Sequence, residues 1–172
     1  EMLGDHGLMS KLGFFDQSFH IPLIIRYPAL DGPVGGVVDR FTENVDVMPT
    51  LLDLAGAEVP RQCQGRSLRP FLAGEEPDQW RSAVHWEYDF RLFAGVADLP
   101  GNRCNLAVHR DRTGKYVHFA GWPALFYDLV DDPDECRPLA AHPSMADHAA
   151  ALLGWRMATD EQELSDHLAL PG

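Results

Sequence analysis

The residues best suited to chemistry gather near the start of the chain, where a carboxylate, an imidazole and an ammonium group occur close together. Asp5 and His6 are adjacent, and Lys11 follows five residues after His6. Carboxylate and imidazole groups are frequent ligands of divalent metals. An ammonium group can stabilise negative charge on the oxygens of a substrate. This cluster therefore indicates a site for an anion, although short loops with Asp, His and Gly are also common without any ligand.

Other polar side chains have plainer interpretations. His85 and Glu87 share one face of an expected strand and could touch a substrate, but a half-buried strand with polar residues on one side explains them better. His109 and His118 could oppose each other across a hairpin, which favours a cross-strand pair over a metal site. The acidic run 131–135 lacks the spaced ligands and the central glycine of a calcium loop, so we expect a solvated turn.

Composition narrows the class of protein. The 172 residues carry a net charge of −12, with 45% apolar and 23% charged residues, which is typical of a globular domain with a core. An acidic surface repels phosphates, so we expect no nucleic acid partner and no membrane partner. No apolar run is long enough to span a bilayer. Cys63, Cys104 and Cys136 form no closely spaced pair, which favours reduced thiols and a cytoplasmic location.

The spacing of apolar residues, together with capping residues, glycines and prolines, predicts the helices and strands that would position these residues. A short, Pro-bounded apolar run at 21–27 predicts a buried strand. Asp46 can cap a helix that ends at Gly56, with an apolar face formed by Met48, Leu51, Leu52 and Ala55. A second short helix is expected at 67–72. The later part of the chain predicts strands at 82–90, 104–109, 115–119 and 126–129, followed by helices that begin at Ser144 and Thr159.

Several motifs follow one another in a distinctive order. They are Glu1–Leu8 with Lys11, Gly13–Ser18, Ile21–Ile25, Val45–Gly56, Gln64–Leu68, Phe126–Leu129 and Asp132–Glu135. Taken together, they resemble the sulfatase family of the alkaline-phosphatase-like superfamily, and they look closest to its phosphonate monoester hydrolase and phosphodiesterase branch. The resemblance runs from Glu1 to about Met157.

This resemblance implies an α/β fold. We expect the C-terminal part of an alkaline-phosphatase-like sandwich, with a small antiparallel sheet and a C-terminal helix. Residues 1–78 would end the sulfatase-like α/β domain, and residues 79–172 would form a C-terminal subdomain of antiparallel strands and terminal helices. The abrupt, glycine-rich start without an initiating Met also suggests a piece of a longer protein.

The resemblance also implies an activity and a catalytic residue. The family hydrolyses sulfate, phosphate or phosphonate esters, using a formylglycine nucleophile and one divalent metal (Ca, Mn or Mg). Lys11 matches the family's active-site lysine. Asp5 and His6 have the same residue types as the family's metal-binding pair. In the family, however, that pair lies before the position of Glu1, so we expect Asp5 and His6 to approach the substrate and not to bind the metal. Where the family often has Arg, this chain has His20.

The chain alone is therefore expected to be inactive and to bind no cofactor. No cysteine lies in the Cys-x-Pro-x-Arg setting of a formylglycine precursor. The nucleophile and the metal ligands would come from the rest of the same polypeptide, and the substrate would be a small anionic ester. The full protein is expected to form a homo-oligomer.

Two rival hypotheses remain at this point. The first is a non-catalytic C-terminal module for structure or oligomerisation, formed by the acidic tail and the helix at 154–157, in which Trp155 and Met157 would be packing or subunit-contact residues. The second is a local metal site formed by Asp5, His6 and His20.

Overall fold

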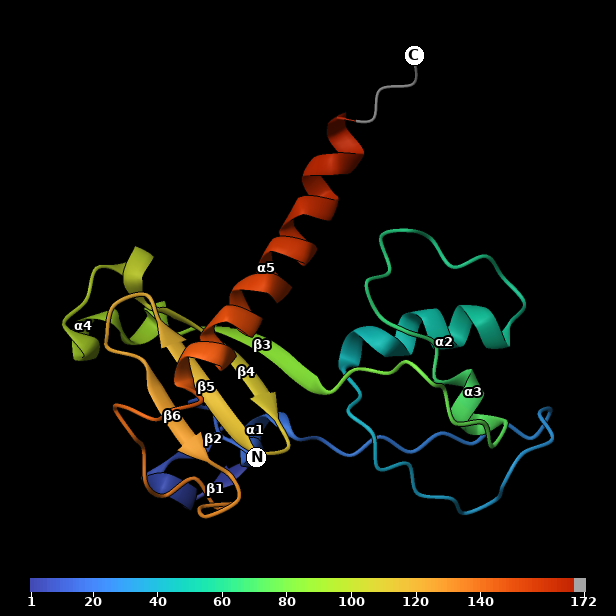
Figure 1. Cartoon of the computed structure of the whole chain (residues 1–172), viewed down its shortest axis with the longest axis horizontal. Coiled ribbons are helices and arrows are strands. Elements are labelled where there is room, and N and C mark those ends of the chain that lie inside the picture. Colours follow the sequence, from blue (N-terminus) through green and yellow to red (C-terminus); the bar gives the residue numbers. More distant parts are fainter. Residues whose placement is uncertain (169–172) are drawn as a thin grey trace. The chain divides into compact units, whose positions relative to one another are not determined.

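A computed structural model describes the backbone of residues 1–168 and the side chains of residues 1–95 and 97–159. The chain divides into two compact units (Figure 1). The first contains Glu1–Pro22 and His85–Gly172, and the second contains Leu23–Val84. The division expected between residues 78 and 79 remains a prediction about the full protein. Within this chain, the first 22 residues group with the C-terminal half rather than with the segment that follows them.

The first unit is built on a four-stranded sheet with the order β3-β4-β5-β6. Its strands are β3 (Ala83–Asp89), β4 (Asn105–Asp111), β5 (Gly114–Phe119) and β6 (Leu125–Asp128). The β4–β5 and β5–β6 pairs are antiparallel, so the hairpin and the flanking strands expected from the sequence are confirmed. Short helices lie between β3 and β4, namely η3 (Arg91–Phe93), α4 (Ala94–Ala97) and η4 (Gly101–Arg103).

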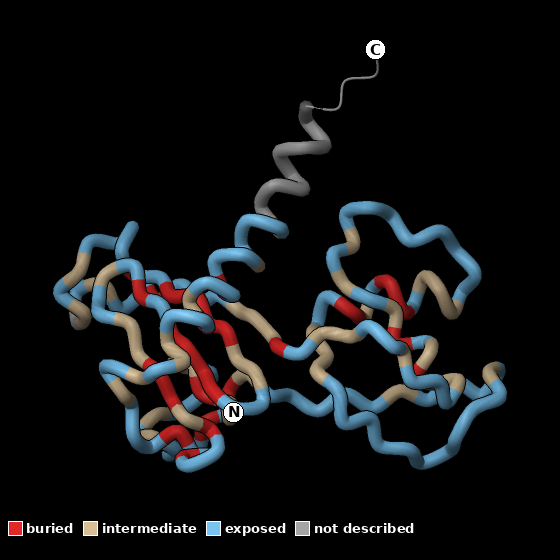
Figure 2. The backbone as a smooth tube through the Cα atoms, viewed as in Figure 1, coloured by how far each residue is buried: buried red, intermediate tan, exposed pale blue. Residues whose placement is uncertain are grey.

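Side chains that alternate along the strands form two separate apolar clusters. Leu106 and Val108 of β4 pack with Met2 and Phe15 of the N-terminal segment on one face. Ala107 of β4 and its neighbours on β5 and β6 pack under α5 (Met145–Leu168) on the other. Figure 2 shows that burial concentrates on the central strands. The sheet is therefore covered by the start of the chain on one face and by its final helix on the other.

Helix α5 differs from the two terminal helices that the sequence predicts. It is one continuous helix of 24 residues. Gly154 lies in its middle without ending it, because a single glycine lowers helix stability only modestly. The inward stripe contains Met145, Ala149, Leu152 and Trp155, whereas Leu153 is 59% exposed. Among the described residues, no helix is long and apolar enough to cross a membrane.

The N-terminal segment forms a small hairpin and one helical turn. Strands β1 (Met2–Leu3) and β2 (Met9–Ser10) pair antiparallel, and the turn η1 (Asp5–Gly7) joins them. Helix α1 (Asp16–Phe19) follows. Residues 21–27 are not a strand, in contrast to the prediction. A strand needs a hydrogen-bonded neighbour, and within the described chain this run has none, so Ile24 is 92% exposed.

The second unit contains η2 (Asn44–Asp46), α2 (Val47–Leu54) and α3 (Arg69–Leu72). Both predicted helices are present, but the expected apolar face of α2 is not the buried one: Met48 and Leu51 are 58% and 59% exposed. The buried side contains Pro49 and Thr50. Polar contacts decide this orientation, because the Thr50 hydroxyl donates to Asp46 O (2.6 Å) and accepts from the Leu68 N–H (2.8 Å).

Asp46 precedes α2, but its side chain makes no capping hydrogen bond to this helix, so the expected capping role is wrong. Asp46 instead organises this unit. Its buried carboxylate accepts hydrogen bonds from the N–H groups of Glu43 and Arg66, each at 2.8 Å, and from the guanidinium of Arg81. The Arg66 segment approaches so closely that a Cβ atom on Gly65 would lie 2.0 Å from Val45 O. Glycine is therefore required at position 65.

Candidate functional site

The three candidate residues from the sequence all lie on or beside the N-terminal hairpin. Asp5 and His6 occupy its turn, where Gly4, His6 and Gly7 have positive φ values of 117°, 51° and 71°. Glycine adopts this region at little cost, which explains the flanking Gly residues. Lys11 directly follows β2 and is exposed. The hairpin thus presents an ammonium group at its base and a carboxylate and an imidazole at its tip.

Asp5 and His6 are held by local contacts. Asp5 Oδ2 accepts the N–H of Leu3 at 3.2 Å. The His6 ring stacks on Phe15 with 3.8 Å between centroids and an angle of 6° between the planes. Among the described residues, the side chains that gather like metal ligands do not include Asp5, His6 or His20. The geometry therefore does not support the local metal site that was the second rival hypothesis.

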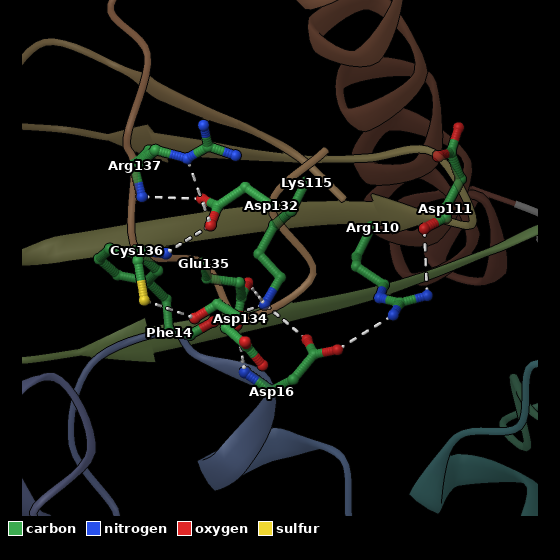
Figure 3. A network of polar contacts seen from close by, with 10 residues as sticks. All are labelled: Phe14, Asp16, Arg110, Asp111, Lys115, Asp132, Asp134, Glu135, Cys136 and Arg137. Carbon is green, nitrogen blue, oxygen red and sulfur yellow. Dashed lines mark hydrogen bonds and ion pairs between the residues drawn. The ribbon is translucent and has the colours of Figure 1, made fainter. Parts of the chain in front are cut away.

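A buried ion-pair network fixes the segment that follows Lys11 (Figure 3). The side chain of Lys115 on β5 is fully buried, and its Nζ lies 2.5 Å from Asp16 Oδ1 and also pairs with Glu135. Nζ donates to Phe14 O at 3.3 Å, and the Asp16 N–H donates to Glu135 Oε2 at 2.8 Å. These contacts attach the start of α1 to the sheet through both main chain and side chains.

The charges in this network balance closely. Arg110 lies opposite Lys115 in the β4–β5 register, and its Nη2 donates to Asp16 Oδ2 at 3.0 Å. Burial acts to raise the pKa of Asp16, but the charges and hydrogen bonds of Lys115 and Arg110 outweigh it and leave that pKa lowered. The carboxylate of Asp16 therefore stays ionised and holds two neighbouring cations on the same face of the sheet.

The acidic turn after β6 is only partly the solvated turn that the sequence predicts. Asp131 and Asp134 are exposed, whereas Asp132 and Glu135 are 7% and 2% exposed. The Asp132 carboxylate accepts the N–H groups of Cys136 (3.1 Å) and Arg137 (2.7 Å), which shapes the turn and directs Glu135 to Lys115. Burial, together with the charges of Glu135 and Asp132, raises the pKa of Tyr127 to about 12.

The histidines of the sheet lie elsewhere than expected. His109 is opposite Tyr116, and His118 is opposite Ala107, so the proposed His109–His118 pair is wrong. His109 Nδ1 instead lies 2.9 Å from His85 Nε2. His85 stacks on Trp155 of α5 with 4.6 Å between ring centroids.

Glu87 and a third histidine complete this face of the sheet. Glu87 pairs with Arg156 of α5 at 3.2 Å, so, like His85, it contacts the helix. His148, also on α5, lies near His109 and Asp111. Sequence reasoning did not identify this group. His109 and Asp111 are two residues apart, so they share one face of β4, and the sequence could have indicated this pair. His148 could not be added to it without knowing where α5 lies.

Comparisons with known proteins agree with the resemblance described above. The chain is 42% identical over 180 residues to the multifunctional alkaline phosphatase superfamily protein PehA of Trinickia caryophylli, covering 99% of this chain and 35% of that protein. It is 42% identical over 141 residues to an N-acetylglucosamine-6-O-sulfatase of Bacteroides thetaiotaomicron, covering 77% of this chain and 23% of that protein.

A solved structure is similar as well. The phosphonate monoester hydrolase of Agrobacterium radiobacter matches with a TM-score of 0.75 and 47% identity, over 94% of this chain and 32% of that one. The chain thus spans about a third or less of the length of these relatives. The expected fold class is confirmed. Residues 4–162 match the family model described as N-sulphoglucosamine sulphohydrolase, C-terminal, and the chain therefore belongs to this sulfatase family within the alkaline-phosphatase-like superfamily.

Proposed function

We propose that this chain contributes Lys11 to the active site of a hydrolase that cleaves sulfate, phosphate or phosphonate esters. The relatives that are named sulfatases and phosphonate monoester hydrolases support this class of reaction. The observation that carries the proposal is the setting of Lys11. It is exposed at the base of the N-terminal hairpin, and the segment after it is attached to the sheet by the buried Lys115–Asp16–Glu135 network.

The role of Lys11 follows from the chemistry of ester hydrolysis at sulfur or phosphorus. Negative charge spreads over the equatorial oxygens of the transferred group in the transition state. A fixed ammonium beside those oxygens stabilises that charge most when the backbone carrying it does not have to reorganise. The loss of one such contact typically raises the barrier by about 3 kcal/mol. Asp5 and His6, on the same hairpin, would lie at the edge of the substrate site.

The metal and the formylglycine implied by the family do not fit the residues seen at this hairpin. Asp5 is bonded to the main chain of Leu3, and His6 stacks on Phe15. We propose that the metal ligands lie immediately before Glu1 and that the nucleophile also comes from the rest of the polypeptide. A bound Ca²⁺, Mn²⁺ or Mg²⁺ would polarise the ester and favour nucleophilic attack.

The test is a substrate panel run on the protein at its native length and on the 172-residue chain. The panel contains an aryl sulfate, a phosphodiester and a phosphonate monoester, each with and without EDTA. We expect the native-length protein to hydrolyse at least one ester and to lose activity with EDTA, and the chain alone to show no turnover. Metal-dependent turnover by the chain alone, abolished by Lys11→Ala, would contradict the proposed placement of the metal ligands.

A second candidate function rests on exposed apolar side chains of α5. Leu153 and Met157 are 59% and 52% exposed. If the chain is a non-catalytic module, α5 would form the contact between subunits of the homo-oligomer expected for the full protein. Light scattering on the native-length protein with Leu153→Ser and Met157→Ser would show a smaller species if α5 forms the contact. Activity that survives Lys11→Ala would favour the purely structural role.

We also propose a cytoplasmic location. Its support is that Cys63, Cys104 and Cys136 are all free thiols, a pattern more common in reducing compartments. Fractionation of cells that express the native-length protein would test the location.

A further inference from the structure

Three side chains that can bind a metal converge between the sheet and α5. His109 and Asp111 lie on β4, and His148 lies on the first turns of α5. One ligand atom from each lies within 4.8 Å of the others. His109 and His148 are only 7% and 6% exposed. This group is on the opposite face of the sheet from the cluster that packs against the N-terminal segment.

The hydrogen bonding of His148 fixes which of its nitrogens is available. Its Nδ1 lies 2.9 Å from Ser144 O. A carbonyl oxygen can only accept, so Nδ1 carries the proton and Nε2 of the neutral ring keeps a lone pair. This Nε2 is buried and has no hydrogen-bond partner, although it lies 3.2 Å from Asp111 Oδ2. Two acceptors that face each other at this distance repel unless a cation or a proton lies between them.

Asp111 is oriented toward His148 by the hairpin turn. Its Oδ1 accepts the N–H groups of Thr113 (2.7 Å) and Gly114 (2.8 Å) and the Thr113 hydroxyl (2.9 Å). The turn therefore holds Oδ1, and Oδ2 remains directed at His148.

His109 contacts another histidine instead of a carbonyl oxygen. Its Nδ1 lies 2.9 Å from His85 Nε2, and His85 is held by stacking on Trp155. When Nδ1 of His109 donates to His85, its own Nε2 keeps the lone pair that a metal needs. Metal-binding histidines commonly donate their second ring N–H to a carboxylate, a backbone carbonyl or water, as His148 does to Ser144 O.

The backbone leaves room for the group at Gly114. A Cβ atom there would lie 3.1 Å from His148 Nε2, and 2.4 Å from Phe126 Cζ. Any larger residue would therefore crowd the side of His148 that faces Asp111.

We propose that His109, Asp111 and His148 bind a divalent transition metal, with Zn²⁺ as the best match to two imidazoles and one carboxylate. Zinc binds such nitrogen and oxygen ligands at about 2.0–2.2 Å and leaves a fourth position for water or another group. The ion would neutralise the two facing acceptors and link α5 to β4. The family resemblance implies no metal ligands within this chain, so the proposal departs from that expectation.

The test measures how many equivalents of zinc the native-length protein binds after all metal has been removed and zinc has been added back. Elemental analysis gives the equivalents bound by wild type, His148→Gln and Asp111→Asn. Asn at position 111 keeps the Oδ1 acceptor of the turn, so we expect Asp111→Asn to fold like wild type. Circular dichroism checks that each variant is folded. His118→Gln is the matched control, because His118 lies outside the group and contacts the Tyr116 hydroxyl.

We expect both site variants to bind one equivalent less than wild type. Their zinc affinity at this site should fall by at least about 10- to 100-fold, which is the loss typical of removing only an outer-shell partner. The control should match wild type. A Co²⁺-loaded wild-type protein should also show a visible absorption band that His148→Gln removes. Equal zinc content in all four proteins would overturn the proposal and leave a proton shared by His148 and Asp111. Because the count concerns one site, failure of the ester-hydrolysis proposal would not affect it.

Discussion

Lys11 and Lys115 are the two lysines of the chain, and they lie in opposite environments. Lys11 is exposed, whereas the side chain of Lys115 is completely buried between Asp16 and Glu135. A buried ammonium is tolerated only when it is paired and hydrogen-bonded. We interpret Lys115 as a structural residue that positions the segment carrying Lys11.

Replacing Lys115 with Met should destabilise the protein strongly. The substitution leaves Glu135, which is 2% exposed, without its cation. Breaking a buried ion pair from one side typically costs about 3–5 kcal/mol. Urea denaturation of the native-length protein measures the change. The double variant Lys115→Met with Glu135→Gln should recover part of the loss, and a loss below about 1 kcal/mol in the single variant would contradict a paired, buried Lys115.

The lowered pKa of Asp16 predicts a specific loss of stability in acid. The folded state binds the Asp16 proton less readily than the unfolded state does. Its stabilising contribution is therefore fully present above about pH 4, the ordinary range of an aspartate, and is lost as the pH falls through the lower folded pKa. Urea denaturation at a series of pH values should show a smaller acid-induced loss in Asp16→Asn than in wild type. Identical pH dependence in the two proteins would refute this assignment.

At the scale of elements, two glycines have opposite roles. Gly154 lies inside α5 with nothing within 4 Å of an added Cβ, whereas a Cβ on Gly65 would lie 2.0 Å from Val45 O. Gly154→Ala should stabilise the protein by about 0.5–1 kcal/mol, because alanine is the better helix former. Gly65→Ala should destabilise it through the backbone clash. Thermal unfolding of the two matched variants checks both signs, and a destabilised Gly154→Ala would argue against a continuous α5.

Elements with strong local signals could be predicted from the sequence. The β4–β5 hairpin follows from two strand-like runs around a glycine-containing turn, and α2 follows from a proline in its first turn and Gly56 after its end. The expected strand at 21–27 failed, because pairing partners are not encoded locally. The expected break before Thr159 failed because a capping pattern inside a helix does not by itself end it.

At the scale of the whole molecule, the decisive contacts join distant parts of the sequence. Asp16 contacts Lys115 across 99 residues and Glu135 across 119. The motifs containing Asp16 and Glu135 could be recognised separately, but neither their contact nor the role of Lys115 between them follows from periodicity. The position of Lys11 in its motif could be predicted from the family resemblance. The His109–Asp111–His148 group could not, since it depends on where α5 crosses the sheet.

The most direct test of the central claim is the effect of Lys11→Ala on kcat/KM of the native-length protein with its best sulfate or phosphonate ester. Arg91→Ala is the matched control, because it removes an exposed positive charge that pairs with its near neighbour Asp89. The account predicts a fall of about 100-fold or more for Lys11→Ala, with unfolding unchanged, and wild-type activity for the control. Activity of Lys11→Ala equal to that of the control would contradict it.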